Sequence, residues 1–243
     1  MRDWVCGFFM AWGMFLAIPC PRKIWSEGAR QKMLVCMPLV GLLAGGVWAG
    51  AWLLLRGAPG PVRAAVCAAV PWLVTGFMHL DGYMDVCDAV LSRRDLATRQ
   101  RILKDSHCGA FAVICMVLLA MGQWSLFLAA EDVSWLALLL IPAATRACAG
   151  LAVLGLRPMG TSQYAAMGPA RGGYGAALWV LLALSVGLPL WLDGSFGPLA
   201  AAVGYGLAVW YGFRQLDGMS GDISGFALTV GELWGAVTLA VWR

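Results

Sequence analysis

Long apolar runs alternate with short polar connections along the chain, and this pattern predicts an all-α membrane protein. A helix needs about 20 apolar residues to cross a hydrocarbon core of about 30 Å. Seven runs reach or approach that length, so we expect a polytopic helix bundle with about seven transmembrane helices. The runs cover residues 33–55, 63–80, 110–129, 135–156, 176–192, 197–213 and 223–242.

The connections are too short to fold alone, which predicts a single integral membrane domain over residues 1–243. Residues 4–19 predict a short apolar N-terminal helix that either spans the membrane or lies at its interface. Pro19, directly before Cys20, argues against cleavage as a signal peptide or a lipoprotein. Residues 81–109 are the longest polar connection, and we expect them to form a cytoplasmic segment with acidic and basic side chains that carries the active site.

The composition supports lipid as the solvent for most of the surface. Of the 243 residues, 61% are hydrophobic and only 12% are charged, which excludes an ordinary soluble domain. The net charge of +4 is small, and no nucleic acid partner is implied. Lys and Arg concentrate in alternate connections, which the positive-inside rule places in the cytoplasm. The residues on that side are Arg22, Lys23, Arg30, Lys32, Arg93, Arg94, Arg99, Arg101, Lys104, Arg157, Arg171 and Arg214, against Arg56, Arg63 and Arg243 on the other.

Three aspartates at the end of the second run are the strongest chemical signal. Asp81, Asp85 and Asp88 are spaced i, i+4, i+7, which places them on one stripe of a helix. Like charges this close repel, so the cluster needs a cation or a protonated member. Mg²⁺ is commonly held by one or two carboxylates together with substrate phosphates. We therefore predict a Mg²⁺ site that binds a diphosphate, with a solvated acidic helix end as the alternative.

The residues that follow this stripe add weaker candidates. Lys104 and His107 are placed to meet phosphate oxygens, and Asp105 is a candidate base or further metal ligand. His79 precedes the first aspartate; it is a candidate substrate contact or an ordinary histidine at a helix end. Asp222 is a candidate catalytic carboxylate, or only a helix cap.

One charged residue lies in the middle of a predicted span. Arg146 must face an anionic partner inside the bundle, because an uncompensated charge there costs about 3 kcal/mol. Substrate phosphate and an acidic side chain are both candidates for that partner. Glu232, within the last run, is the acidic candidate.

Several motifs in order resemble the cobalamin synthase family, the adenosylcobinamide-GDP ribazoletransferases, over almost the whole chain. The matching blocks are Met37-Pro-Leu-Val-Gly-Leu-Leu-Ala-Gly45, His79-Leu-Asp-Gly-Tyr-Met-Asp-Val-Cys-Asp88, Ile102-Leu-Lys-Asp-Ser-His-Cys-Gly109 and Ser220-Gly-Asp-Ile-Ser-Gly225. The sequence departs from the family pattern at four positions: Ala89 and Ala112 stand where Gly is usual, His107 where Arg is usual, and Thr229 where Glu is usual.

The resemblance implies a late step of cobalamin biosynthesis at the bacterial inner membrane. The expected attacking atom is the 5′ oxygen of α-ribazole, or of its 5′-phosphate. It attacks the phosphoryl group attached to cobinamide, GMP leaves, and adenosylcobalamin or its 5′-phosphate forms. The implied metal is Mg²⁺ on Asp81, Asp85 and Asp88, with catalytic roles for Lys104, Asp105 and Asp222. Implied substrate contacts are His79, Ser106, His107, Arg146 and Ser220. Membrane lipid is an expected partner, and homo-oligomerisation is left open.

Two other functions remain as alternatives. One is a phosphotransferase acting on CDP-alcohols, which also uses membrane-embedded aspartates and Mg²⁺. The pattern of that family carries an Ala-Arg pair after its first Asp-Gly, and no such pair follows Asp81 here. The other is a transporter or corrinoid-binding protein without catalysis, which would suit the intramembrane Arg146 and Glu232.

Overall fold

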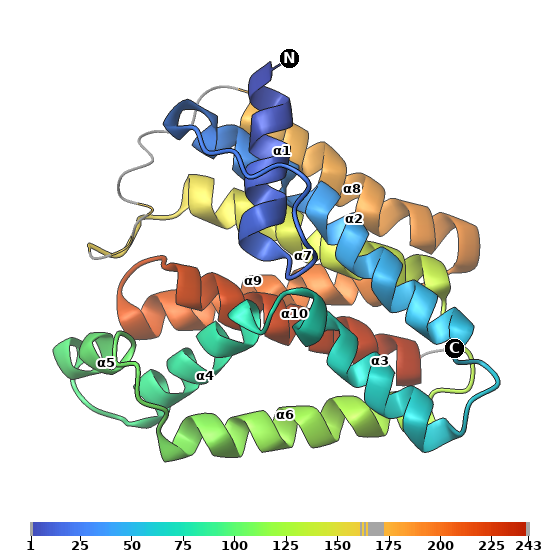
Figure 1. Ribbon diagram of the computed structural model, residues 1–243. Helices are drawn as coiled ribbons and strands as arrows, with labels where there is room; N and C mark the ends of the chain where they lie inside the picture. The colour runs from blue at the N-terminus through green and yellow to red at the C-terminus, as the bar shows by residue number, and fades with distance from the viewer. Residues whose placement is uncertain (1, 161, 163, 165–172, 242–243) are drawn as a thin grey trace.

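A computed structural model describes residues 2–160, 162, 164 and 173–241. In these residues the chain is all-helical, and the only β-type pairing is an isolated bridge between Pro158 and Met219. The helices are α1 (Arg2–Phe15), η1 (Glu27–Ala29), α2 (Arg30–Leu54), α3 (Gly60–Val74), α4 (Met78–Leu91), α5 (Leu96–Ile102), α6 (Ala110–Ala129), α7 (Trp135–Gly155), α8 (Tyr174–Asp193), α9 (Gly197–Leu216) and α10 (Gly221–Val241). Their arrangement confirms the predicted all-α bundle (Figure 1).

Five helices within the described residues are long and apolar enough to cross a membrane, and the pair α3 and α4 together adds a sixth candidate span. The five are α2 extended by η1, α6, α7, α8 and α10. Helix α9 has 20 residues, but it is not among the candidates. The prediction of about seven spans is therefore approximate, with α9 accounting for the difference.

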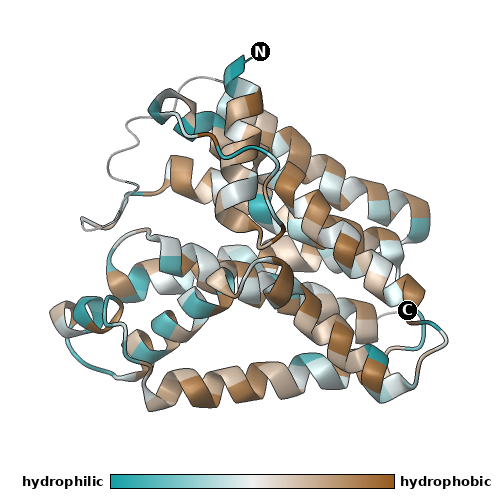
Figure 2. Ribbon diagram, in the orientation of Figure 1, coloured by the Kyte–Doolittle hydropathy of each residue, from teal (hydrophilic) through white to brown (hydrophobic). Residues whose placement is uncertain are grey.

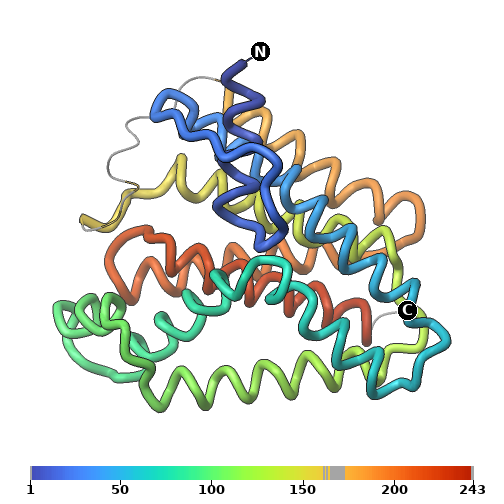
Figure 3. The backbone as a smooth tube through the Cα atoms, in the orientation of Figure 1, coloured from blue at the N-terminus to red at the C-terminus, as the bar shows by residue number. Residues whose placement is uncertain are grey.

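Helices α3 and α4 form a bent pair, either a broken span or a re-entrant loop, so the prediction of one continuous helix over residues 63–80 is wrong. The two helices meet at 90° across residues 75–77 (Figure 3). Gly76 and Phe77 have φ angles of 59° and 64°, in the left-handed region that ends an α-helix. The run of apolar residues was visible in the sequence, whereas this change of direction was not.

The break frees backbone carbonyls that would otherwise continue the helix, and nearby groups satisfy them. The Thr75 hydroxyl donates to the Pro71 carbonyl oxygen at 2.9 Å. The Ala17 N–H, from the connection after α1, donates to the Val74 carbonyl oxygen at 2.8 Å. The N-terminal segment thus closes the point where α3 ends.

Helix α1 packs across α2, with the Lys32 ammonium 2.6 Å from the Asp3 carboxylate. Its 14 residues extend about 21 Å, less than the hydrocarbon thickness, and α1 is not among the candidate spans. Of the two predicted arrangements for residues 4–19, the structure favours the one in which this helix does not cross the membrane.

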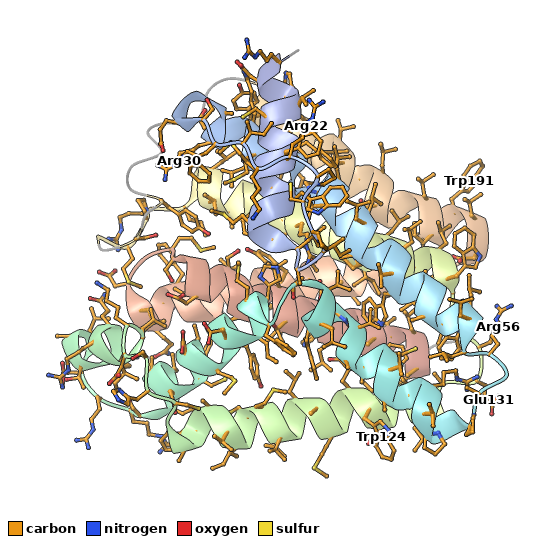
Figure 4. All side chains as sticks on the ribbon, viewed as in Figure 1. Arg22, Arg30, Arg56, Trp124, Glu131 and Trp191 are labelled. Carbon is orange, nitrogen blue, oxygen red and sulfur yellow. The ribbon has the colours of Figure 1, made fainter. Side chains whose placement is uncertain are left out.

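Polar connections gather at the two ends of the bundle. The α5 end, where α4 ends and α6 begins, also holds the connection between α9 and α10 (Figure 1). Hydrophilic residues interrupt α4 and α5, whereas α6 is mostly hydrophobic along its length (Figure 2). Arg56, Glu131 and Trp191 mark the opposite end (Figure 4). The predicted cytoplasmic segment 81–109 is divided between these elements: residues 81–91 belong to α4, and the remainder forms α5 and its connections.

Helices α2 and α7 touch through their backbones at two glycines. A Cβ atom on Gly41 would lie 2.5 Å from the Pro142 carbonyl oxygen, and one on Gly45 would lie 2.0 Å from the Leu139 carbonyl oxygen. Real Cβ atoms do not approach this closely, so only glycine permits the crossing. On the same helix, Gly50 has no such neighbour within 4 Å.

We predict that Gly45→Ala destabilises the protein by about 1–3 kcal/mol, because the added methyl group forces α2 and α7 apart. Thermal unfolding of the purified protein in detergent measures the effect. Gly50→Ala is the matched control and should unfold at the wild-type temperature. Equal unfolding temperatures for all three proteins would show that this crossing does not limit stability.

Candidate active site

The candidate site is built where α4 crosses α10 with almost no side chain between them. A Cβ atom on Gly82 would lie 2.8 Å from the Asp222 carbonyl oxygen, and one on Gly225 would lie 3.1 Å from the His79 carbonyl oxygen. The Thr229 hydroxyl on α10 donates to the same His79 oxygen at 3.2 Å. Thr229, which stands where Glu is usual in the family, therefore forms a hydrogen bond to the backbone of α4 at this crossing.

This crossing brings two distant acidic segments together. Asp85 lies near enough to Asp81 and Asp222 for their charges to interact, and Asp81 and Asp222 also interact with each other. Among the ion pairs of the described residues, none involves these three carboxylates. In the same part of the chain, no group of three or more His, Cys, Asp or Glu side chains is arranged to hold a metal ion. The cluster is acidic but not assembled as a three-residue metal site.

Asp88 also lies near enough to Asp85 for their charges to interact, but hydrogen bonds to backbone N–H groups already occupy its carboxylate. Its carboxylate accepts hydrogen bonds from the N–H groups of Gly109, at 2.5 Å, and Ala112, at 3.0 Å. Only 9% of Asp88 is exposed. The side chain caps the first turn of α6, and the favourable position of a negative charge at a helix N-terminus explains its burial. Because the contact with position 112 uses the backbone, the alanine found there leaves it intact.

Lys104 and Asp222 line the same cavity, although 118 positions separate them in the sequence. Both side chains line a cavity of about 260 Å³ at the α5 end, together with Ser220 and Gly221. The Ser220 hydroxyl accepts from the Ile223 N–H at 3.3 Å, so this serine also caps α10. The structure thus joins two of the predicted catalytic residues in one cavity.

The third predicted catalytic residue, Asp105, lies outside the cavity. Its carboxylate accepts from the backbone N–H of His107 at 3.0 Å and lies 2.6 Å from the Nδ1 atom of the same residue. These contacts hold the pKa of Asp105 below its usual value. Asp105, Ser106 and His107 are exposed and do not line the cavities that contain Asp222. The structure therefore does not bring them to the acidic cluster.

A second cavity, of about 240 Å³, is also lined by Asp222. It is bounded by α1, α2, α4 and α10, and Asp81 and His79 line it from α4. Asp222 and Gly221 are common to both cavities. One carboxylate therefore faces two spaces that two different substrate groups can occupy.

Sequence reasoning missed two residues of this second cavity, Arg30 and Tyr164. Arg30 stands at the start of α2 (Figure 4), 3.2 Å from the Glu27 carboxylate. Burial, and then the nearby Asp222 carboxylate, raise the pKa of Tyr164 to about 12. In the sequence, Arg30 contributes only to the positive-inside rule, and Tyr164 belongs to no motif. No local pattern therefore indicates that either residue lines a site.

Arg146 forms a buried ion pair with Glu232. Two partners were predicted for it: first a substrate phosphate, and second an acidic side chain. Its Nη1 atom donates to the Glu232 carboxylate at 2.8 Å and to the Pro142 carbonyl oxygen at 3.1 Å. Only 1% of Arg146 is exposed, and it lines neither cavity. The second arrangement is present, and the predicted substrate contact has no support in this geometry.

Comparison with known proteins supports one family. A family model described as "Cobalamin-5-phosphate synthase" matches residues 7–240. A relative from Clostridium perfringens (strain 13 / Type A), named adenosylcobinamide-GDP ribazoletransferase, is 32% identical over 243 residues, covering 96% of each chain. Relatives with the same name occur in Clostridium botulinum (strain Alaska E43 / Type E3), 33% identical over 250 residues and 97% of each chain, and in Halalkalibacterium halodurans, 39% identical over 155 residues, 60% of this chain and 58% of the relative. No solved structure matches the chain.

We predict that Asp88→Ala destabilises the protein by about 1–2 kcal/mol, because the first turn of α6 loses its cap. Asp88→Asn keeps an acceptor and should lose less. Thermal unfolding in detergent compares both with Asp132→Ala, an exposed aspartate between α6 and α7 that should unfold as the wild type does. If Asp88 were instead a metal ligand, the Asp88→Asn variant would unfold at the wild-type temperature without Mg²⁺, and adding Mg²⁺ would no longer raise its unfolding temperature.

Proposed function

The chain belongs to the cobalamin-5-phosphate synthase family, and we propose that it joins α-ribazole, or α-ribazole 5′-phosphate, to adenosylcobinamide-GDP with release of GMP. The near full-length similarity to ribazoletransferases supports this function. The single structural observation that carries the mechanism is that Asp222 lines two cavities, because the reaction must bring two substrates to one phosphorus atom.

The reaction is a phosphoryl transfer in which one P–O bond forms and another breaks. A ribose hydroxyl attacks the phosphorus attached to cobinamide, and the bond from that phosphorus to the bridging oxygen breaks, so that GMP leaves with this oxygen. When the nucleoside carries a 5′-phosphate, the product retains it, and the attacking oxygen is therefore a different ribose hydroxyl. The proton of that hydroxyl needs an acceptor, and Asp222 is our candidate base.

Lys104 is our candidate for stabilising the leaving group. It shares the cavity of about 260 Å³ at the α5 end with Asp222 and Ser220. Negative charge accumulates on the departing phosphate, and an ammonium group positioned beforehand stabilises that charge more in the transition state than in the ground state. The diphosphate of adenosylcobinamide-GDP would then lie on this side of Asp222.

Asp81 and Asp85 are our candidate ligands for Mg²⁺. Their carboxylates repel each other, carry hard oxygen donors and take part in no ion pair of the described residues. Two carboxylates with substrate phosphates form a common magnesium environment, so these donors fit the ion without a third protein ligand. When bound, Mg²⁺ would neutralise the diphosphate and polarise its phosphorus.

We place the protein in the bacterial inner membrane as a multi-pass protein, with the α5 end in the cytoplasm. The basic residues of the connections at that end support this orientation through the positive-inside rule. Helices α6 and α8 are mostly unburied within the bundle, and their apolar surfaces suit lipid as a partner.

GMP release by the purified protein in nanodiscs tests the function. We expect release that requires both GDP-cobinamide and α-ribazole 5′-phosphate and that depends on Mg²⁺. Asp85→Asn should lower kcat by about 100-fold or more, the usual cost of removing one group that stabilises a transition state. Asp132→Asn, an exposed aspartate at the far end, is the control and should retain full activity.

Two results would contradict this proposal. Release of CMP from CDP-diacylglycerol and an alcohol, with none of GMP from GDP-cobinamide, would favour the CDP-alcohol phosphotransferase. Tight binding of GDP-cobinamide with no nucleotide release under any condition would favour a corrinoid-binding or transport protein.

Cys108 provides a test of orientation, because its side chain is exposed and it lies at the α5 end. In a variant that keeps only this cysteine, a membrane-impermeant maleimide should label inverted vesicles and not right-side-out cells. A cysteine introduced by Asp132→Cys in the cysteine-free background should show the opposite labelling. The reverse pattern at both positions would overturn the assigned topology.

A further inference from the structure

The 240 Å³ cavity has walls of two kinds. Deep in the bundle it is lined by apolar side chains, among them the buried Met33, Met37 and Leu228. Asp81 and Asp222 stand at its acidic edge. A ligand that fills this space must therefore present an apolar body and a polar, reactive end.

His79 adds an unused hydrogen-bonding group to the apolar part. The imidazole lines the cavity, stacks on Phe15 at a ring separation of 6.2 Å, and is 7% exposed. Its Nε2 atom is buried without a hydrogen-bond partner. Buried polar atoms are usually paired, and one that is not needs a partner supplied by a ligand or water. The transfer chemistry assigned above to Asp222 and Lys104 makes no use of this nitrogen.

We propose that the cavity binds the heteroaromatic base of α-ribazole, with the His79 imidazole hydrogen-bonded to the unsubstituted ring nitrogen of that base. This inference rests on the proposed function and names the place of one of its two substrates. The dimethylated benzene ring of the base packs among the methionines. The ribose then extends toward Asp81 and Asp222, where its hydroxyl reacts.

The chemistry of the walls separates this base from the other groups of the two substrates. Guanine presents several donors and acceptors on its edges, and the part of the cavity lined by Met33, Met37 and Leu228 offers no partners for them, although Arg30 and Tyr164 line the cavity elsewhere. The corrin ring is far larger than a nucleoside, whereas the cavity is smaller than the range of about 300–1,000 Å³ typical of sites for drug-sized ligands. Methionine walls suit an apolar aromatic group because the thioether is polarizable and contacts ring edges favourably.

Met37 is the position for a test, because it is 4% exposed and forms part of the apolar wall. Met37→Trp fills the space that the base would occupy. We expect the Kd for α-ribazole, measured by calorimetry in nanodiscs, to rise at least about tenfold. The Kd for GDP-cobinamide should stay within about twofold of wild type, since a well-separated site is unaffected. Met121→Trp on the exposed face of α6 is the matched control and should leave both Kd values unchanged.

A second variant tests the hydrogen bond and does not depend on cavity filling. His79→Phe keeps an aromatic ring against Phe15 and removes both nitrogens. We expect the KM for α-ribazole to rise about tenfold or more, with kcat at saturating nucleoside changed far less. A benzimidazole nucleoside without the two ring methyl groups should bind wild type about tenfold more weakly than α-ribazole, because it loses contacts with the methionines.

The outcomes separate this inference from the function on which it rests. Wild-type protein that releases GMP, together with Met37→Trp and His79→Phe variants that bind α-ribazole as tightly as wild type, would overturn the inference alone. So would variants in which the Kd for GDP-cobinamide rises and that for α-ribazole does not. Wild-type protein that neither binds α-ribazole nor releases GMP would overturn the proposed function and this inference with it. If Met37→Trp does not elute as a single folded species, His79→Phe decides the question.

Discussion

The site depends on the crossing of α4 over α10, where the backbones of the two helices are in close contact. Gly82 and Gly225 remove the side chains that would keep the two helices apart, and Thr229 adds a hydrogen bond across the gap. Because the helices approach this closely, Asp222 comes within range of the α4 carboxylates. A side chain at either glycine would move the acidic groups away from one another and separate the two cavities that now share Asp222.

The bend between α3 and α4 sets the direction in which α4 meets α10. A straight helix over residues 60–91 would carry its aspartates through the bundle along one line, whereas the 90° bend directs α4 across α10 and toward the α5 end. Backbone groups freed at such a bend are costly in lipid unless they are paired. Ala17 supplies one of the missing donors, so the N-terminal segment is part of the structure that supports the site.

Charge inside the bundle is handled in two ways, and the difference indicates function. Arg146 and Glu232 neutralise each other in a buried pair, which leaves no free charge for a ligand. Asp81, Asp85 and Asp222 have no such partner among the ion pairs of the described residues, and Asp81 and Asp222 line cavities. An uncompensated acidic cluster needs a cation or a protonated member to balance it, and the first of these agrees with the phosphoryl transfer proposed above.

The sequence by itself determined the membrane class, most helix positions, the acidic stripe of α4 and the resemblance to a family, because each of these depends on local periodicity or on a contiguous motif. It could not determine which side chains meet. Helical spacing places Asp88 on the same stripe as Asp85, yet the position of α6 decides that Asp88 caps a helix. Likewise, Lys104 and Asp222 share a cavity only because the connection after α5 folds against the start of α10. A helical pattern gives the direction in which a side chain leaves its own helix, whereas the packing of distant helices decides what it contacts.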